Sequence, residues 1–161
     1  MTKDPWDAET IAAFETCKAE LANAILLAQP IEGITLLLST DASDTAIGAS
    51  LKQVSNDKLS SIAFFSKKFS DIQMKYSIYD QELLTIYKSI KYFKHILQSR
   101  IVIIRIDHKP LTHAFKQHLD KPSPRQAQQL DLIAQFTTNL VHIAGQENIV
   151  PDTLSCINAI L

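Results

Sequence analysis

The chain has 161 residues, 46% of them hydrophobic and 20% charged, which fits one globular domain with a hydrophobic core. It contains no charge-poor apolar run long enough to cross a bilayer, and Met1-Thr2-Lys3-Asp4 lacks the basic-then-apolar pattern of a signal peptide. Cys17 and Cys156 lie far apart without metal-ligand spacing, so we expect reduced thiols of an intracellular protein rather than a zinc site or a disulfide.

The net charge of −1 is unevenly distributed along the chain. Residues 62–125 hold twelve of the sixteen basic and five of the seventeen acidic residues, a net +7, and the four basic and twelve acidic residues elsewhere leave −8. A molecule of this kind could present a basic face to phosphates. A solvated helix face also explains such a bias, and for the charge bias alone it is the favoured interpretation.

The first half of the chain predicts a helix followed by three strands. Asp7 is a candidate N-cap for a helix that ends before Pro30. Residues 34–40 predict a buried strand, and short strands follow at 45–53 and 62–66. Tight links between them favour an antiparallel meander. Gly48 indicates a close backbone approach or a bulge.

The strand at 34–40 runs directly into Asp41. An unpaired carboxylate is strongly disfavoured in an apolar interior. An acid at the end of a core strand is therefore expected to face a metal, a base or a helix N-terminus. These three alternatives set the question for the rest of the chain.

A second strand with the same ending follows an amphipathic helix. Ser77 with Asp80 predicts the N-terminus of that helix, and Glu82 lies at the edge of its apolar stripe. Taken alone, Glu82 is explained well as a helix-dipole carboxylate. The strand at 101–106 ends in Asp107.

A helix between two strands favours parallel pairing through a right-handed crossover. If the strands at 34–40 and 101–106 are neighbours, Asp41 and Asp107 meet at one edge of the sheet, where ligands bind in α/β folds. Two acids there would repel each other unless a cation lay between them. The combination favours a metal site more than either acid does alone.

The last third predicts four further elements. Residues 109–115 are a short turn or helical piece, and Ser123-Pro124 begins a helix. A last strand covers 139–144. A final helix covers 149–155, with Asp152 in its first turn.

These residues together resemble a known family. The ordered motifs are Thr-Asp-Ala-Ser at 40–43, Ala-Phe-Phe-Ser-Lys-Lys at 63–68, Tyr-Ser-x-Tyr-Asp-x-Glu-Leu-Leu at 76–84, Asp-His-Lys-Pro-Leu at 107–111, Ser-Pro-Arg-Gln at 123–126, and His-Ile-Ala-Gly-Gln-Glu-Asn at 142–148 before Pro-Asp-Thr-Leu-Ser. The set resembles the ribonuclease H domain of gypsy-type LTR retrotransposon reverse transcriptases over residues 34–155.

The resemblance implies a fold and a division of the chain. The expected fold is α/β, a ribonuclease H-like mixed five-stranded sheet with antiparallel strands 1–3 and parallel strands 4–5, flanked by helices. Residues 31–157 would form this domain. Residues 1–30 would be the helical tail of the preceding reverse-transcriptase connection region.

The resemblance also implies a metal centre made of Asp41, Glu82, Asp107 and Asp152. These four would bind two Mg²⁺ ions, with Mn²⁺ able to substitute, since hard oxygen ligands suit them. Two ions about 3.5–4 Å apart would serve in-line displacement at phosphorus. By analogy Asp41 bridges the ions, Asp152 helps hold the one that activates water, and the other two acids hold the one that stabilises the leaving oxygen.

The implied substrate is the RNA strand of an RNA–DNA hybrid, and the implied partner is the polymerase domain of a reverse transcriptase. Reading of 2′-hydroxyls would distinguish RNA from DNA. Candidate nucleic-acid contacts are Ser43, Gln53, Lys91, Lys109 and Arg125, and further candidates are Gly48, Lys88, Lys94, Lys116 and Lys121.

Three features depart from the family pattern. The loop at 145–148 lacks the histidine that cellular and retroviral ribonucleases H carry before the last aspartate. We expect His142 and His108 to be structural, with His108 the better candidate for a polar contact near the site. Pro151 precedes Asp152, and Cys156 replaces the family's terminal arginine.

Two functional hypotheses remain open. The first is an active metal-dependent endonuclease, the ribonuclease H part of a retroelement polymerase. The second is a catalytically inactive, domesticated domain that binds nucleic acid or acts as a scaffold. For either, the expected location is intracellular, in the cytoplasm (within virus-like particles) or the nucleus, with no membrane partner.

Overall fold

The computed structural model describes residues 11–16, 27–56, 58–112 and 122–156. The elements whose full extent lies within these residues are five strands, β1 (Leu36–Ala42), β2 (Ala46–Ser55), β3 (Lys58–Lys68), β4 (Val102–Ile106) and β5 (Leu140–His142); three helices, α2 (Ile78–Leu97), α4 (Pro124–Ala134) and α5 (Ile149–Ser155); and two 3₁₀ turns, η1 (Gln73–Lys75) and η2 (Gly145–Glu147). None of the helices in these ranges is long and apolar enough to cross a membrane.

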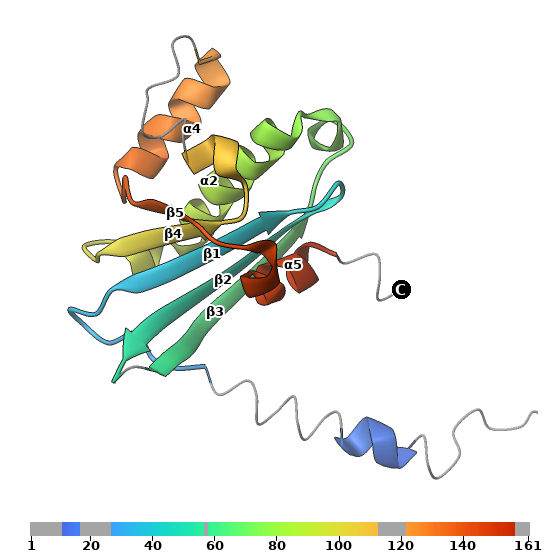
Figure 1. Ribbon diagram of the computed structural model, residues 1–161, viewed down its shortest axis with the longest axis vertical. Helices are drawn as coiled ribbons and strands as arrows, with labels where there is room; N and C mark the ends of the chain where they lie inside the picture. The colour runs from blue at the N-terminus through green and yellow to red at the C-terminus, as the bar shows by residue number, and fades with distance from the viewer. Residues whose placement is uncertain (1–10, 17–26, 57, 113–121, 157–161) are drawn as a thin grey trace, which may run out of the picture.

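The strands form one mixed sheet in the order β3-β2-β1-β4-β5 (Figure 1). β1, β2 and β3 pair antiparallel, and β4 pairs parallel with both β1 and β5. The predicted fold class is confirmed, including the parallel neighbours β1 and β4 that flank the crossover helix α2.

Two helix N-termini follow the local signals in the sequence. Ser77 accepts the backbone N–H of Asp80 at the start of α2. Ser123 and Gln126 form a reciprocal capping box at the start of α4, with Pro124 at its first position. Both helices begin where the sequence predicts, because caps are made by neighbouring residues.

Helix α2 packs its apolar stripe on one face of the sheet. Leu36 and Leu38 of β1 are fully buried against Ile86, Ile90 and Phe93 of α2. Each fully buried side chain of this kind contributes roughly 1.5–3 kcal/mol. This core fixes the axis of α2 relative to the ends of β1 and β4.

Helix α5 lies against the opposite face, over β1, β2 and β3 (Figure 1). Gly48 makes this contact possible, because a Cβ there would lie 1.9 Å from the backbone oxygen of Pro151 and 2.6 Å from the backbone nitrogen of Ser155. The close approach predicted at Gly48 is confirmed. The irregularity in pairing occurs elsewhere in β2, between Leu51 and Lys52.

Some boundaries differ from the predictions. β3 runs from Lys58 to Lys68, well beyond the predicted 62–66, because its polar ends pair with β2 at the edge of the sheet. The last strand is shorter than 139–144 and ends at His142. Residues 11–16 and 109–112 are helical as expected. Residues 27–29, predicted as the end of the first helix, have no regular secondary structure, and the rest of the two predicted segments lies outside the described residues.

The segment that leads into β1, residues 29–31, is hydrogen-bonded by two side chains. Gln53 donates to the carbonyl of Gln29 (3.0 Å) and accepts the N–H of Ile31 (2.9 Å), and Arg100 donates to the carbonyl of Ile31. Gly33 then turns the chain into β1 with φ of +76°, a conformation that glycine adopts at little cost.

Candidate metal centre

Asp41 lies near the C-terminal end of the central strand β1. It is 8% exposed, with Gly48 of β2 directly opposite it. Its Oδ2 accepts the hydroxyl of Ser155 from α5 at 2.6 Å. The carboxylate of Asp41 at the end of β1 is therefore largely shielded from water.

Glu82 reaches the same place from α2. It is 5% exposed, and its Oε2 has no hydrogen-bond partner among the described residues. Leu83 and Ile86, which follow Glu82 in α2, are buried in the core and fix the turn that carries it. Asp107 follows the last residue of β4 and is half-buried.

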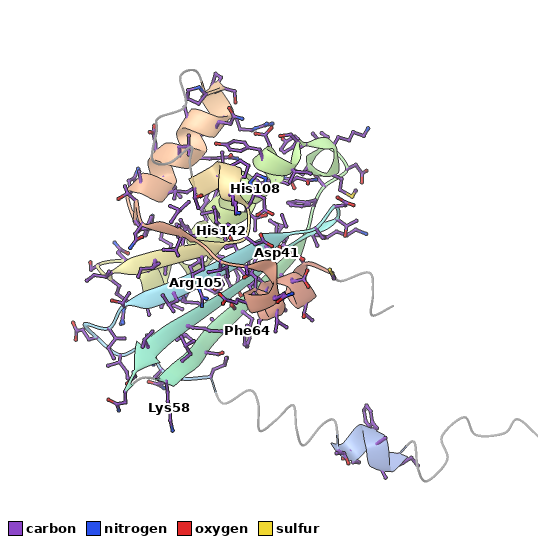
Figure 2. The ribbon with its side chains drawn as sticks, in the orientation of Figure 1. Asp41, Lys58, Phe64, Arg105, His108 and His142 are labelled. Carbon is purple, nitrogen blue, oxygen red and sulfur yellow. The ribbon has the colours of Figure 1, made fainter. Side chains whose placement is uncertain are left out.

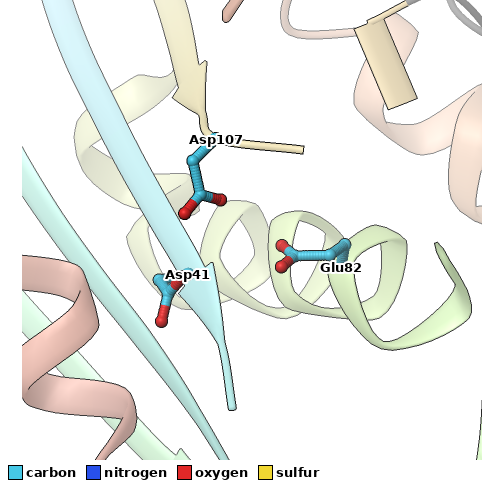
Figure 3. A group of neighbouring side chains, drawn as sticks. All are labelled: Asp41, Glu82 and Asp107. Atoms are coloured by element: carbon cyan, nitrogen blue, oxygen red, sulfur yellow. The ribbon is translucent and has the colours of Figure 1, made fainter. Parts of the chain in front are cut away.

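The three carboxylates converge at the C-terminal ends of β1 and β4 (Figure 3). One oxygen from each of Asp41, Glu82 and Asp107 lies within 4.8 Å of the others. The strand-end argument from the sequence predicted this meeting for Asp41 and Asp107, and the family resemblance added Glu82.

The electrostatics of the cluster are those of an uncompensated acidic site. Burial, and next the charges of Asp41 and Asp107, raise the pKa of Glu82 to about 8. Burial also raises the pKa of Asp41; the Ser155 hydroxyl lowers it, and the charges of Asp107 and Asp152 raise it. Such shifts mark a place where a cation or a proton is needed.

Asp152 is not part of this cluster. It is exposed in the first turn of α5, and its charge contributes to the raised pKa of Asp41. Pro151 before it is buried at the third position of the helix, where a missing N–H breaks no intrahelical bond. The role predicted for Asp152 as a fourth ligand stays a prediction.

Two residues near the cluster had not been singled out from the sequence. Ser155 bonds Asp41, and Asn148, 1% exposed at the start of α5, donates to the carbonyl of Thr40 at 2.9 Å. The only signal was their position within the last motif. A contact between residues 108 or 114 positions apart cannot be read from spacing.

The structural roles expected for His142 and His108 stay predictions, and the buried Nδ1 of His108 has no hydrogen-bond partner among the described residues. The Nε2 of His142 lies 3.1 Å from the backbone oxygen of Asp107. His108 is partly buried; burial lowers its pKa and the charge of Asp107 raises it. Figure 2 labels both histidines together with Asp41.

Among the candidate nucleic-acid contacts, the structure contradicts the prediction for Gln53. It is 1% exposed, and both ends of its amide bond the backbone of residues 29–31, so it holds the entering chain instead of facing a substrate. Gly48 is likewise covered by α5. The hydroxyl of Ser43 is used within its loop and on the carbonyl of Ser155.

The basic candidates are placed differently from one another. Lys91 and Lys109 are exposed, with the Nζ of Lys91 5.2 Å from the ring centre of Tyr87. Arg125 pairs with Asp80 at 3.4 Å and stacks on Tyr76 at 4.0 Å. Lys88 is half-buried and Lys94 exposed on α2, while Lys116 and Lys121 fall outside the described residues.

Comparison with known proteins places this geometry in a family. The family model described as "RNase H-like domain found in reverse transcriptase" matches residues 6–104. The transposon Tf2-3 and Tf2-4 polyproteins of Schizosaccharomyces pombe are each 32% identical over 153 residues, covering 93% of this chain and 12% of the polyprotein. The chain thus spans about an eighth of the length of these curated relatives.

Solved structures share the fold at low identity. The native protease-reverse transcriptase of prototype foamy virus has a TM-score of 0.61 at 15% identity, covering 86% of this chain and 19% of that chain. RNase H1 from Halobacterium salinarum has a TM-score of 0.54 at 11% identity (75% and 92% covered). LC11-RNase H1, solved in complex with an RNA/DNA hybrid, has 0.55 at 13% identity (80% and 99% covered). These three show the fold alone. The family model and the Tf2 relatives establish that the chain belongs to the RNase H-like domains found in reverse transcriptases, of the gypsy-type retrotransposon kind.

Proposed function

We propose that the chain is a metal-dependent endonuclease that hydrolyses the RNA strand of RNA–DNA hybrids, as the ribonuclease H part of a retrotransposon reverse transcriptase. One observation carries the proposal. Three acids from three separate elements, Asp41, Glu82 and Asp107, meet within 4.8 Å in a site that is largely buried. A purely structural domain gains nothing from this arrangement, because buried like charges repel each other.

The donor set fits magnesium. All three groups are carboxylates, and the buried Oε2 of Glu82 has no partner among the described residues, as expected of a ligand atom. Asp41, Glu82 and Asp107 would hold the ions, two Mg²⁺ with Mn²⁺ as a substitute, and Asp152 would join them from α5. Bound ions supply charge stabilisation at phosphorus and at the attacking and leaving oxygens.

The protein's own contribution is position. β1 and β4 fix Asp41 and Asp107 at adjacent strand ends, and α2 fixes Glu82 beside them. Exposed Lys91 and Lys109 are proposed to neutralise phosphates of the hybrid. The polymerase part of the same polyprotein is the proposed partner, and the proposed location is the cytoplasmic particle or the nucleus.

The exposed position of Asp152 outside the cluster favours a second candidate. In that case the domain binds nucleic acid, or serves as a scaffold, without cutting. The two candidates differ in one measurable property, which is metal-dependent cleavage.

The test is a cleavage assay with the 161-residue chain on a hybrid labelled on its RNA strand. Wild type, Asp107→Asn and the exposed control Asp131→Asn are compared in Mg²⁺, Mn²⁺ and EDTA, with duplex DNA and duplex RNA as alternative substrates. We expect the RNA strand of the hybrid alone to be cut in either metal. Asp107→Asn should lower the rate by about two orders of magnitude or more, the scale of one lost transition-state contact.

Asp131→Asn should cut like wild type. If the folded wild type cuts nothing even in Mn²⁺ but binds the hybrid in a salt-sensitive way, the binding-module candidate replaces the nuclease.

A further inference from the structure

Helix α5 is seated on the sheet by two serine hydroxyls besides the contact at Gly48. Ser43, from the loop after β1, donates to the backbone oxygen of Ser155 at 2.7 Å. Ser66, on β3, donates to the backbone oxygen of Leu154 at 2.7 Å. The carbonyls that end α5 thus find donors on the sheet, and the end of the helix is fixed relative to β1.

The same end of α5 carries Ser155, which is fully buried. Its hydroxyl lies 2.6 Å from Oδ2 of Asp41 and 2.9 Å from the backbone oxygen of Asp152. In Figure 3, α5 lies on the side of Asp41 away from Glu82. Ser155 therefore contacts Asp41 from the side that faces away from Glu82.

We infer that Ser155 is a positioning residue of the metal centre, which orients the carboxylate of Asp41 before a cation binds. This inference rests on the proposed function and concerns the same site. A carboxylate with one oxygen bonded to a fixed hydroxyl has its plane set, and the direction of its other oxygen is set with it. Ligands oriented in this way by an outer partner bind metal more tightly, because less ordering remains to be done on binding.

The chain offers controls that separate this role from general support of α5. Thr153 lies on the same helix and is exposed, and its hydroxyl donates to the carbonyl of Ile149. Ser66 helps to seat α5, and its hydroxyl donates to the backbone oxygen of Leu154 rather than to an acid. Removing either hydroxyl changes the helix or its seating without changing what Asp41 contacts.

The experiment is a Mn²⁺ titration of the full chain without nucleic acid, followed by electron paramagnetic resonance of the free ion. Wild type, Ser155→Ala, Ser155→Thr, Thr153→Ala and Ser66→Ala are compared, each first checked for a cooperative thermal transition in EDTA. We expect Ser155→Ala to weaken Mn²⁺ binding by about 10- to 100-fold, the range for outer-shell partners. Ser155→Thr, which keeps the hydroxyl, should recover most of the affinity, and the two controls should bind within about twofold of wild type.

Two results would overturn the inference: Ser155→Ala binding Mn²⁺ like wild type, or Ser66→Ala weakening it equally. If Ser155→Ala does not fold, NMR of the carboxyl carbon of Asp41 in metal-free wild type tests the inference instead. An Asp41 carboxylate that exchanges between orientations would overturn the inference. Hybrid cleavage is measured in parallel. If wild type cleaves the hybrid and Ser155→Ala binds Mn²⁺ as tightly as wild type, only the inference about Ser155 is wrong. If Ser155→Ala binds Mn²⁺ more weakly but wild type does not cleave the hybrid, only the proposed nuclease activity is wrong. If wild type binds no Mn²⁺, both are wrong.

Discussion

Among the three acids of the cluster, Glu82 is the one whose charged form is most unfavourable. A carboxylate that is 5% exposed, with an oxygen that has no partner among the described residues, is unfavourable in its charged form. Burial raises its pKa to about 8, from an ordinary value of 4.5, and the charges of Asp41 and Asp107 add to the rise. Without metal, we therefore expect Glu82 to hold a proton in the folded chain at neutral pH.

This shift predicts how metal-free stability depends on pH. Between pH 4.5 and about 8 the folded state keeps the Glu82 proton that the unfolded state has lost, so the free energy of unfolding falls as pH rises through that window. The fall should reach a few kcal/mol, since one pKa unit corresponds to about 1.4 kcal/mol. Urea unfolding in EDTA at several pH values measures it.

The control for this series is Glu32→Gln, the same substitution at an exposed glutamate. It should keep the pH dependence of wild type, whereas Glu82→Gln should flatten it. Equal pH slopes in wild type and Glu82→Gln would show that Glu82 is not the group responsible.

Gln53 illustrates a side chain whose role only the fold reveals. Gln53→Ala should lower the free energy of unfolding by about 2 kcal/mol, because two backbone groups of the entering segment lose their buried partner. Its affinity for hybrid should not change. Chemical denaturation and hybrid binding measure the two quantities, with the exposed Gln128→Ala on α4 as the control. Unchanged stability combined with weaker hybrid binding would restore Gln53 as a substrate contact.

At the scale of elements, the seating of α5 on β2 decides where Ser155 and Asp152 lie. Gly48→Ala should cost about 3 kcal/mol of unfolding free energy, an overpacking penalty, because the new Cβ would overlap the backbone of Pro151. Urea denaturation measures it. Gly145→Ala is the matched control, since its Cβ would meet Oδ2 of Asp107 at an ordinary 3.7 Å and should cost less than about 1 kcal/mol. Equal losses in both variants would contradict the close packing of α5.

The elements also show which parts of the fold could be predicted. The starts of α2 and α4 depend on Ser77 and Ser123, each of which bonds a residue three positions away, so local sequence was sufficient. The ends of β3 were missed because their residues are polar and are held only by pairing with β2. Local signals predict elements, while edge pairing depends on neighbours that are distant in sequence.

At the scale of the whole molecule, the surplus of positive charge in residues 62–125 is distributed over surfaces of different kinds. Lys109 lies two residues after Asp107 and is exposed. The guanidinium of Arg125 is already paired with Asp80 and stacked on Tyr76. In Figure 2, Lys58 lies at the end of the sheet away from Asp41.

These positions predict graded effects on the salt dependence of hybrid binding. Lys109→Ala should reduce the slope of log affinity against log salt by about 0.7 to 0.9, the value for one phosphate contact. Arg125→Ala should reduce it less, and Lys58→Ala should leave it unchanged. Fluorescence anisotropy at several salt concentrations gives the slopes. An effect of Lys58→Ala as large as that of Lys109→Ala would mean that binding is not localised near the acidic cluster.

The candidate site was predictable only where sequence patterns bring residues together. Asp41 and Asp107 end two buried strands, and the crossover rule brings such strand ends together, so their meeting followed from pattern alone. Glu82 and Asp152 were assigned by resemblance, and the structure brings only Glu82 into the cluster. Ser155 and Asn148 could not have been found, because their contacts join α5 to β1 across more than a hundred residues.

The most direct test of the central claim, that Asp41, Glu82 and Asp107 form one centre for a divalent cation, is paramagnetic broadening of backbone amide NMR signals by substoichiometric Mn²⁺. We predict that the amides beside these three residues broaden first and together, and that Asp107→Asn removes the effect while Asp131→Asn keeps it. Broadening that begins instead at exposed acids such as Asp71 or Asp131, or that spreads evenly over the surface, would contradict the account.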